Sequence, residues 1–258
     1  MNVLLHRIFS GLQYQWKAQS QYYLHSPFAF QFYQNALLPA RSAQFPKIEH
    51  WRQSLLHNHT TLPVVDFGAG GAGGTRTIRQ LCANTAIPAK YGALLHHSTR
   101  HFQPAVVVEL GTSLGLSTAY MASALPNSRL ISFEGNPAIA GFTGKQLAEN
   151  GWPQIEIVTG NFDDTLQPFL RHHSIDFAFI DGNHRYEPTV RYFEWLLKAS
   201  HPDTVLVFDD IYWSPEMTRA WNHIKAHPAT RTTFDFWRMG FVFLRREMLE
   251  KQHFILRY

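Results

Sequence analysis

Cysteine is almost absent from this chain of 258 residues, since Cys82 is the only one. One thiol excludes an intrachain disulfide, which is typical of a protein from a reducing compartment. No stretch approaches 18 consecutive apolar residues, so no transmembrane helix is expected. The first 16 residues lack a sustained apolar core and a small-residue cleavage pattern, which argues against a signal peptide. We therefore expect a cytoplasmic protein with no membrane partner.

Long runs of basic residues are also missing. The formal net charge is +4, from 23 Lys and Arg against 19 Asp and Glu. So small and dispersed an excess of positive charge argues against a nucleic-acid partner. Apolar residues make up 45% of the chain and aromatic residues 14%. This composition and length predict one large α/β domain, or one such domain with an extension.

The rest of the chain is organised around residues 105–120. Residues 105–110 form an apolar run that is typical of a strand buried on both faces. Two glycines and three hydroxyl residues follow at once: Gly111, Thr112, Ser113, Gly115 and Ser117. A strand, a glycine turn and a helix start place free N–H groups beside a ligand. Many such turns bind nothing, so on this evidence alone a plain turn remains an open alternative.

Apolar runs alternate with helical stretches from residue 105 onward. The candidate strands are 106–110, 129–133, 155–158, 175–180 and 204–208. The candidate helices are 115–125, 137–150, 163–172, 187–199 and 215–227. This alternation predicts a parallel, doubly wound sheet. Two further runs, 232–238 and 241–246, predict an antiparallel pair at the sheet edge.

Acidic or polar residues follow each of the five predicted parallel strands. They are Glu109, Glu134, Asn161, Asp163, Asp181, His184, Asp209 and Asp210. Ligands bind past the carboxyl ends of parallel strands, so this edge is the candidate site. Each acid taken singly could instead cap a helix. Tyr186, Tyr212, Trp213 and Trp237 also follow strand ends and are candidates for an aromatic wall, or for simple packing.

Glu134 lies where an acid can accept hydrogen bonds from both hydroxyls of a ribose. A nicotinamide dinucleotide and S-adenosylmethionine would both satisfy this position. The chain lacks the Gly-x-Gly-x-x-Gly turn that lets a backbone approach a pyrophosphate. This absence disfavours a nicotinamide oxidoreductase.

The N-terminal part reads as helical, with stretches at 2–20, 27–38, 46–57, 75–84 and 90–102. Ser26 before Pro27 predicts a helix N-cap. A strand-like run is followed by the glycine-rich loop 68–74, which is either a structural or lid loop or a ligand contact. We expect a helical extension or lid over residues 1–103 and a second domain over 104–258.

With these motifs in place, the chain resembles class I S-adenosylmethionine-dependent methyltransferases over residues 105–246. The resemblance is to the O-methyltransferase-like group, whose first motif is Glu-x-Gly-Thr-x-x-Gly. It implies a Rossmann-like α/β fold with a doubly wound seven-stranded sheet of order 3-2-1-4-5-7-6, its last strand antiparallel. It implies a methionine subsite lined by Glu109, Gly111, Thr112, Ser113 and Gly115. Glu134 would hold the ribose, and Asn161, Phe162 and Asp163 would lie near the adenine.

Metal-dependent members of this group place an aspartate after the fourth strand and an acidic pair after the fifth. The corresponding residues are Asp181, Asp209 and Asp210, and Asp181 also falls among the implied cofactor contacts. Three carboxylates favour Mg²⁺, or Ca²⁺ or Mn²⁺, over zinc. Catechol-type members carry a catalytic lysine three residues after the first aspartate. This chain has His184 there, which can act as a base but puts a catechol substrate in doubt.

The resulting hypothesis is an enzyme that methylates an oxygen of a small molecule, with Asp181 and His184 as catalytic residues. Assistance by a divalent metal is part of this hypothesis but not required by it. One alternative is metal-independent methylation of a nitrogen or of a macromolecule. Another is a protein that binds S-adenosylmethionine without catalysis, because function depends on the site and not on the fold. The sequence leaves the acceptor open, and a homodimer is compatible with it.

Overall fold

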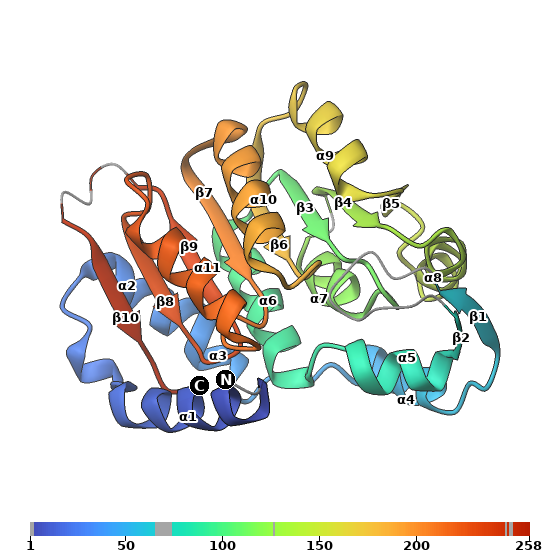
Figure 1. Cartoon of the computed structure of the whole chain (residues 1–258), viewed down its shortest axis with the longest axis horizontal. Helices are drawn as coiled ribbons and strands as arrows, with labels where there is room; N and C mark the ends of the chain where they lie inside the picture. Colours follow the sequence, from blue (N-terminus) through green and yellow to red (C-terminus); the bar gives the residue numbers. More distant parts are fainter. Residues whose placement is uncertain (1–2, 65–73, 126, 246, 248–249) are drawn as a thin grey trace. The chain divides into compact units, whose positions relative to one another are not determined.

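The computed structural model describes residues 3–64, 74–125, 127–245, 247 and 250–258 (Figure 1). The chain divides into two compact units. The first unit is Met1–Phe30 with Leu170–Tyr258, and the second unit is Gln31–Phe169. Neither boundary coincides with the domain limit near residue 103 that we expected from sequence, and that limit stays a prediction.

The second unit contains three parallel strands of the main sheet. Their order is β3 (Val106–Leu110), β4 (Arg129–Glu134) and β5 (Glu156–Thr159). Each strand is followed by a helix: α7 (Leu116–Ala124), α8 (Pro137–Glu149) and α9 (Phe162–Leu170). Val107, Val108 and Leu110 are fully buried, as a strand covered on both faces requires.

The first unit contains five strands, in the order β10-β8-β9-β7-β6. β6 (Ile175–Ile180) and β7 (Ser200–Phe208) are parallel. β9 (Gly240–Phe243) runs antiparallel to both β7 and β8 (Thr232–Asp235). The two helices between these strands are α10 (Tyr186–Lys198) and α11 (Pro215–Ala226).

The predicted fold class is confirmed. Within the units the strand orders are 3-2-1 and 4-5-7-6, and the seventh strand is antiparallel, as predicted. The strand count was wrong, because β10 (Gln252–Ile255) pairs in parallel with β8 as an eighth strand. The β8–β9 pair therefore does not form the edge. Phe254 stacks on Phe234 at a centroid distance of 5.1 Å, which fixes β10 in this position.

The N-terminal elements are mostly the predicted helices. They are α1 (Val3–Lys17), η1 (Gln21–Tyr23), α2 (Pro27–Phe32), the π-helical η2 (Tyr33–Leu37), α3 (Leu38–Ala40), α4 (Pro46–Leu56), α5 (Ile78–Thr85) and α6 (Ala89–Phe102). The Ala29 amide lies 3.5 Å from the Ser26 hydroxyl, in agreement with the predicted N-cap. A hairpin of β1 (Thr61–Val64) and β2 (Gly74–Thr77) precedes α5. Of the predicted loop 68–74, all but Gly74 lies outside the described residues.

Close packing ties the helices to one another and to the sheet. A Cβ on Gly92 would lie 2.3 Å from the Tyr120 ring, so α6 and α7 approach at a position where only glycine fits. A Cβ on Gly240 would similarly lie 2.5 Å from the Trp221 ring. No described helix combines the length and the apolar character needed to span a bilayer.

Candidate functional site

The turn after β3 has an unusual backbone. Gly111, Ser113 and Gly115 have φ angles of 105°, 47° and 76°, which lie in the left-handed region. A Cβ on Gly115 would lie 2.8 Å from Thr143, so a side chain there would meet both strain and a clash. The amide of Gly111 donates to the Phe133 carbonyl at 2.9 Å and thereby fixes the turn to β4.

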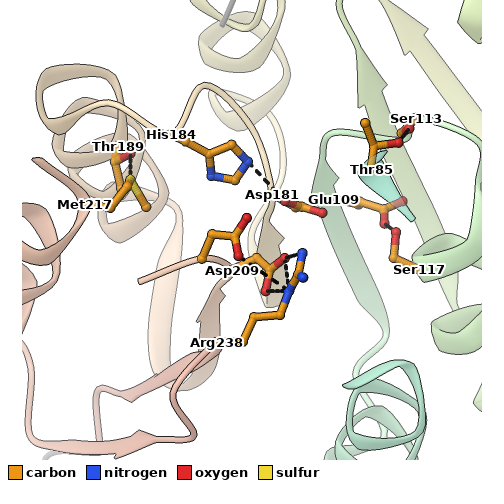
Figure 2. Close-up of polar contacts among 11 residues, drawn as sticks. Thr85, Glu109, Ser113, Ser117, Asp181, His184, Thr189, Asp209, Met217 and Arg238 are labelled. Carbon is orange, nitrogen blue, oxygen red and sulfur yellow. Dashed lines mark hydrogen bonds and ion pairs between the residues drawn. The ribbon is translucent and has the colours of Figure 1, made fainter. Parts of the chain in front are cut away.

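Glu109 is fully buried inside a shell of hydroxyl groups. Its carboxylate accepts hydrogen bonds from Ser117, Thr118 and Ser132, the last at 2.6 Å. These bonds tie β3 to β4 and to the first turn of α7 (Figure 2 shows the bond to Ser117). Glu109 therefore holds the glycine turn in shape, and its direct contact with a cofactor stays a prediction.

Glu134 presents a carboxylate that the backbone has already oriented. Its Oε2 accepts from the Ser113 amide and its Oε1 from the Asn136 amide, both at 2.8 Å. Burial raises the pKa of Glu134, and the amides of Asn136 and Ser113 oppose this rise by stabilising the ionised form. The Gly135 amide is a third backbone partner, so of the roughly four acceptor positions of the carboxylate about one stays open for a hydroxyl group.

The residues after β5 form a helix start. The Asn161 side chain accepts from the Asp163 amide at 3.1 Å, and the Gly160 amide donates to the Glu134 carbonyl at 2.9 Å. These bonds hold the start of α9 beside the end of β4. The predicted adenine contacts of Asn161, Phe162 and Asp163 stay predictions.

Sequence reasoning missed Thr85, whose hydroxyl lies 2.8 Å from that of Ser113 (Figure 2).

In the first unit, three strand ends carry left-handed residues with full side chains. Asn183 after β6, Asp210 after β7 and Trp237 after β8 have φ angles of 64°, 52° and 70°. Each such conformation costs on the order of 1–3 kcal/mol and persists where the surroundings enforce it. Strain of this kind gathers at functional sites, so these strand ends are the candidate reaction site of the first unit.

Asp181 and His184 form an ion pair after β6, with 3.4 Å between Oδ1 and Nε2 (Figure 2). Burial lowers the pKa of His184, but the hydrogen bond to Asp181 and the charges of Asp181, Asp210 and Asp209 raise it to about 9. The two residues predicted to be catalytic are therefore in contact. The imidazole is more basic than an ordinary histidine side chain.

The guanidinium of Arg238 binds the carboxylate of Asp209. The side chain of Asp209 is fully buried. The guanidinium Nε lies 3.0 Å from both oxygens of Asp209, and Nη2 lies 2.7 Å from Oδ2 (Figure 2). Nε also lies 3.5 Å from Asp210. Burial lowers the pKa of Arg238, but the carboxylates of Asp209, Asp210 and Asp181 raise it further, so the side chain stays charged. Sequence reasoning missed Arg238, which is one basic residue in an aromatic run.

Known methyltransferases are similar to this chain in sequence. Residues 108–211 match a family model described as a methyltransferase domain. The chain is 38% identical over 109 residues to a catechol O-methyltransferase of Niastella koreensis, covering 41% of this chain and 48% of that protein. It is 30% identical over 132 residues to catechol O-methyltransferase of Bos taurus, covering 48% of this chain and 47% of that protein.

Solved structures show the same fold. The O-methyltransferase of Bacillus cereus in complex with SAH superposes with a TM-score of 0.60 at 18% identity, covering 81% of this chain and 96% of that chain. The O-methyltransferase TomG of Streptomyces achromogenes in complex with SAM gives 0.54 at 24% identity, covering 63% of this chain and 82% of that chain. The chain is therefore similar to class I S-adenosylmethionine-dependent O-methyltransferases. It spans about half the length of the curated relatives named above.

The acidic residues of this O-methyltransferase-like protein do not fit a divalent metal. Arg238 takes both oxygens of Asp209, and His184 pairs with Asp181. Among the described residues, no group of three or more His, Cys, Asp or Glu side chains is arranged to hold an ion. The guanidinium of Arg238 is the cation that Asp209 already binds. This counts against the predicted site of Asp181, Asp209 and Asp210 for Mg²⁺, Ca²⁺ or Mn²⁺.

Aromatic side chains of the O-methyltransferase-like protein line the same strand ends. Tyr212 stacks on Trp237 with 5.5 Å between ring centroids, and its hydroxyl donates to Asp235. Arg7 of α1 lies over the Trp213 ring at 4.3 Å. Trp237 and Tyr212 thus form part of an ordered aromatic cluster, while Trp213 is exposed.

Proposed function

We propose that this protein transfers the methyl group of S-adenosylmethionine to a hydroxyl of a small molecule. The observation that carries the proposal is the Asp181–His184 pair after β6, accompanied after β7 by Asp209, which Arg238 neutralises. We assign cofactor binding to the turn after β3 and to Glu134. We assign acceptor chemistry to the strand ends of the first unit.

The cofactor supplies, when bound, a methyl group made electrophilic by its sulfonium. The acceptor oxygen forms the new bond to this methyl carbon while the bond from carbon to sulfur breaks. The acceptor proton must leave as oxygen attacks, and His184 is the base for it. Asp181 faces Nε2 of His184, which fixes the tautomer with Nδ1 as the proton acceptor.

The raised pKa of His184 sets the conditions for this role. At pH 7 only about one molecule in a hundred carries the neutral imidazole if the pKa is about 9. The free base is correspondingly strong and suits a phenolic or similarly acidic hydroxyl better than an aliphatic alcohol. We therefore propose an acceptor with an acidic hydroxyl group.

Arg238 supports a reaction without a divalent ion. Its guanidinium holds both oxygens of Asp209 through a bidentate contact and lies beside Asp210, so one of the two negative charges is balanced without a metal. Metal-assisted methylation, which we considered from sequence, is the less favoured alternative, because Arg238 already holds both oxygens of Asp209. The cytoplasmic location and a possible homodimer stay predictions.

The test begins with calorimetric titration of the full chain with S-adenosylmethionine and S-adenosylhomocysteine, each with Mg²⁺ and with a chelator, and with NAD as the control. Micromolar binding of both sulfur ligands, but not NAD, is expected. A screen of phenolic acceptors with radiolabelled methyl donor follows, using the His184→Asn variant and the exposed-site control His172→Asn.

The expected result is transfer to a phenolic oxygen in the presence of chelator, lost in His184→Asn and kept in His172→Asn. Absence of binding of either sulfur ligand would overturn the methyltransferase proposal itself. Binding with transfer only after Mg²⁺ is added would instead overturn the role given to Arg238.

A further inference from the structure

Helix α1 buries polar side chains and exposes apolar ones, which reverses the usual pattern of a helix on a globular core. Its buried residues are His6, Ser10 and Tyr14. Its exposed apolar residues are Val3, Leu4, Leu5, Ile8, Phe9, Leu12 and Trp16. Leu12 is 66% exposed and Trp16 is 84% exposed, so this face meets solvent almost completely.

Polar contacts fix the orientation of α1 on the first unit. The Tyr14 hydroxyl donates to the Leu256 carbonyl at 2.5 Å, and His6 Nε2 lies 2.8 Å from the Thr218 hydroxyl. Gly11 lies against the Trp237 ring, where a Cβ would be 3.2 Å away. Figure 1 shows α1 beside the C-terminus. The helix cannot turn its apolar face inward without breaking these contacts.

Aromatic residues continue the exposed apolar face beyond the end of α1. Tyr22 is 80% exposed, and Tyr23 is also exposed. Tyrosine and tryptophan concentrate where hydrocarbon meets polar headgroups, because one end of each ring system is apolar and the other forms hydrogen bonds. Trp16, Tyr22 and Tyr23 therefore have the chemistry of interfacial anchors.

The charge of this region is entirely positive. The first 48 residues hold four Lys and Arg and no Asp or Glu, so they carry the whole formal net charge of +4. Two of the four, Arg7 and Lys17, are exposed on α1. Lys17 also lies close enough to Lys225 for their charges to repel. Cations beside an apolar face match an anionic surface.

We propose that α1, together with Tyr22 and Tyr23, docks this protein on a bilayer that contains anionic lipids. The helix lies in the plane of the interface with Leu5, Ile8, Phe9, Leu12 and Trp16 among the acyl chains. Arg7 and Lys17 meet the headgroups. A second copy of the chain is the less favoured occupant, because α1 itself carries no acid that could pair with Lys17 of the other copy.

The test is flotation of the full chain with vesicles of phosphatidylcholine alone and of phosphatidylcholine with phosphatidylglycerol at about 7:3. The variant Phe9→Gln, Leu12→Gln, Trp16→Gln removes the apolar face without touching the buried residues. The control variant Leu38→Gln changes an exposed leucine elsewhere. Lys17→Glu tests the charge. Sedimentation velocity without vesicles reports self-association.

The wild type should float with the anionic vesicles and the triple variant should lose roughly tenfold or more of this binding, while Leu38→Gln keeps it. Binding should weaken in Lys17→Glu and in about 0.5 M salt, where charges are screened. Equal flotation of wild type and triple variant would overturn the proposal. The proposal would also be overturned if sedimentation velocity showed a wild-type dimer that the triple substitution dissociates, and if neither protein floated with vesicles.

Discussion

Arg238 and Asp209 form a bidentate ion pair in which the carboxylate is wholly buried and the guanidinium is partly exposed. The pair links the turn after β8 to the end of β7. Its positive member balances the charge of Asp209 within the acidic pair that the sequence predicts as metal ligands. The relationship explains how such a sequence motif can persist in a site whose geometry does not fit a metal.

Replacing Arg238 by methionine should destabilise the protein and change its response to metals. Removal of one partner leaves a buried, uncompensated carboxylate, at a cost of about 3–5 kcal/mol in the free energy of unfolding. Urea denaturation measures this loss. Calorimetry with Mn²⁺ should detect binding only in the variant, because Asp209 is then free. Arg238→Lys, which keeps the charge but not the bidentate contact, should lose less stability. Mn²⁺ binding by the wild type would contradict this interpretation.

The rate of methyl transfer should rise with pH up to the pKa of His184. The folded pKa is raised to about 9, so protonation removes the base below that value and deprotonation restores it above. A kcat profile with one ascending limb, about tenfold per pH unit well below the pKa, is expected. In His184→Asn the profile should flatten. A plateau from pH 6 onward would mean that His184 is not the base.

Replacing Glu134 by glutamine should weaken binding of S-adenosylhomocysteine by roughly tenfold or more, the cost of a hydrogen bond to a charged group. The matched control is Asp164→Asn, an exposed acid of the second unit. Calorimetric Kd values measure both. Equal affinity in the two variants would show that the ribose lies elsewhere.

Stability should fall as the pH drops from about 6.5 towards 4, the window set by the histidines of α6. Burial lowers the pKa of His96 to about 4, and it also lowers the pKa of His97 and His101. Because their unfolded-state pKa is near 6.5, the unfolded chain binds more protons in this window. Urea midpoints at pH 7 and pH 5 report the loss. His96→Gln should reduce the difference, and His172→Asn should not.

Much of the fold was predictable because buried parallel strands carry continuous apolar runs. The bounds of β3 and β6 coincide with the predicted runs, 106–110 and 175–180. β10 has no such signal, because its four residues are held by pairing with β8 and by contact with Phe234. Its existence depends on partners distant in sequence.

The positions of the acidic residues at the strand ends were predictable for a similar reason, because the strand and the turn that follows it fix them locally. The side chains that contact these acidic residues were not predictable. Arg238 reaches Asp209 only through the turn between β8 and β9. Ser132 and Thr118 surround Glu109 only once β4 and α7 have packed against β3. Neither contact leaves a local pattern in the sequence, so sequence reasoning missed Arg238 and the hydroxyl groups around Glu109, and the metal site stays a prediction.

The hydrogen bonds of Gln19 join the first and last segments of the first unit. The Gln19 amide donates to the Ile255 carbonyl, and the Arg257 amide donates to the Gln19 carbonyl. During synthesis by the ribosome, the contiguous second unit emerges complete while α1 still lacks this partner. Helix α1 can form these contacts only after residues 255–257 have been made, so a chaperone or a bilayer has an interval in which to capture its exposed apolar face.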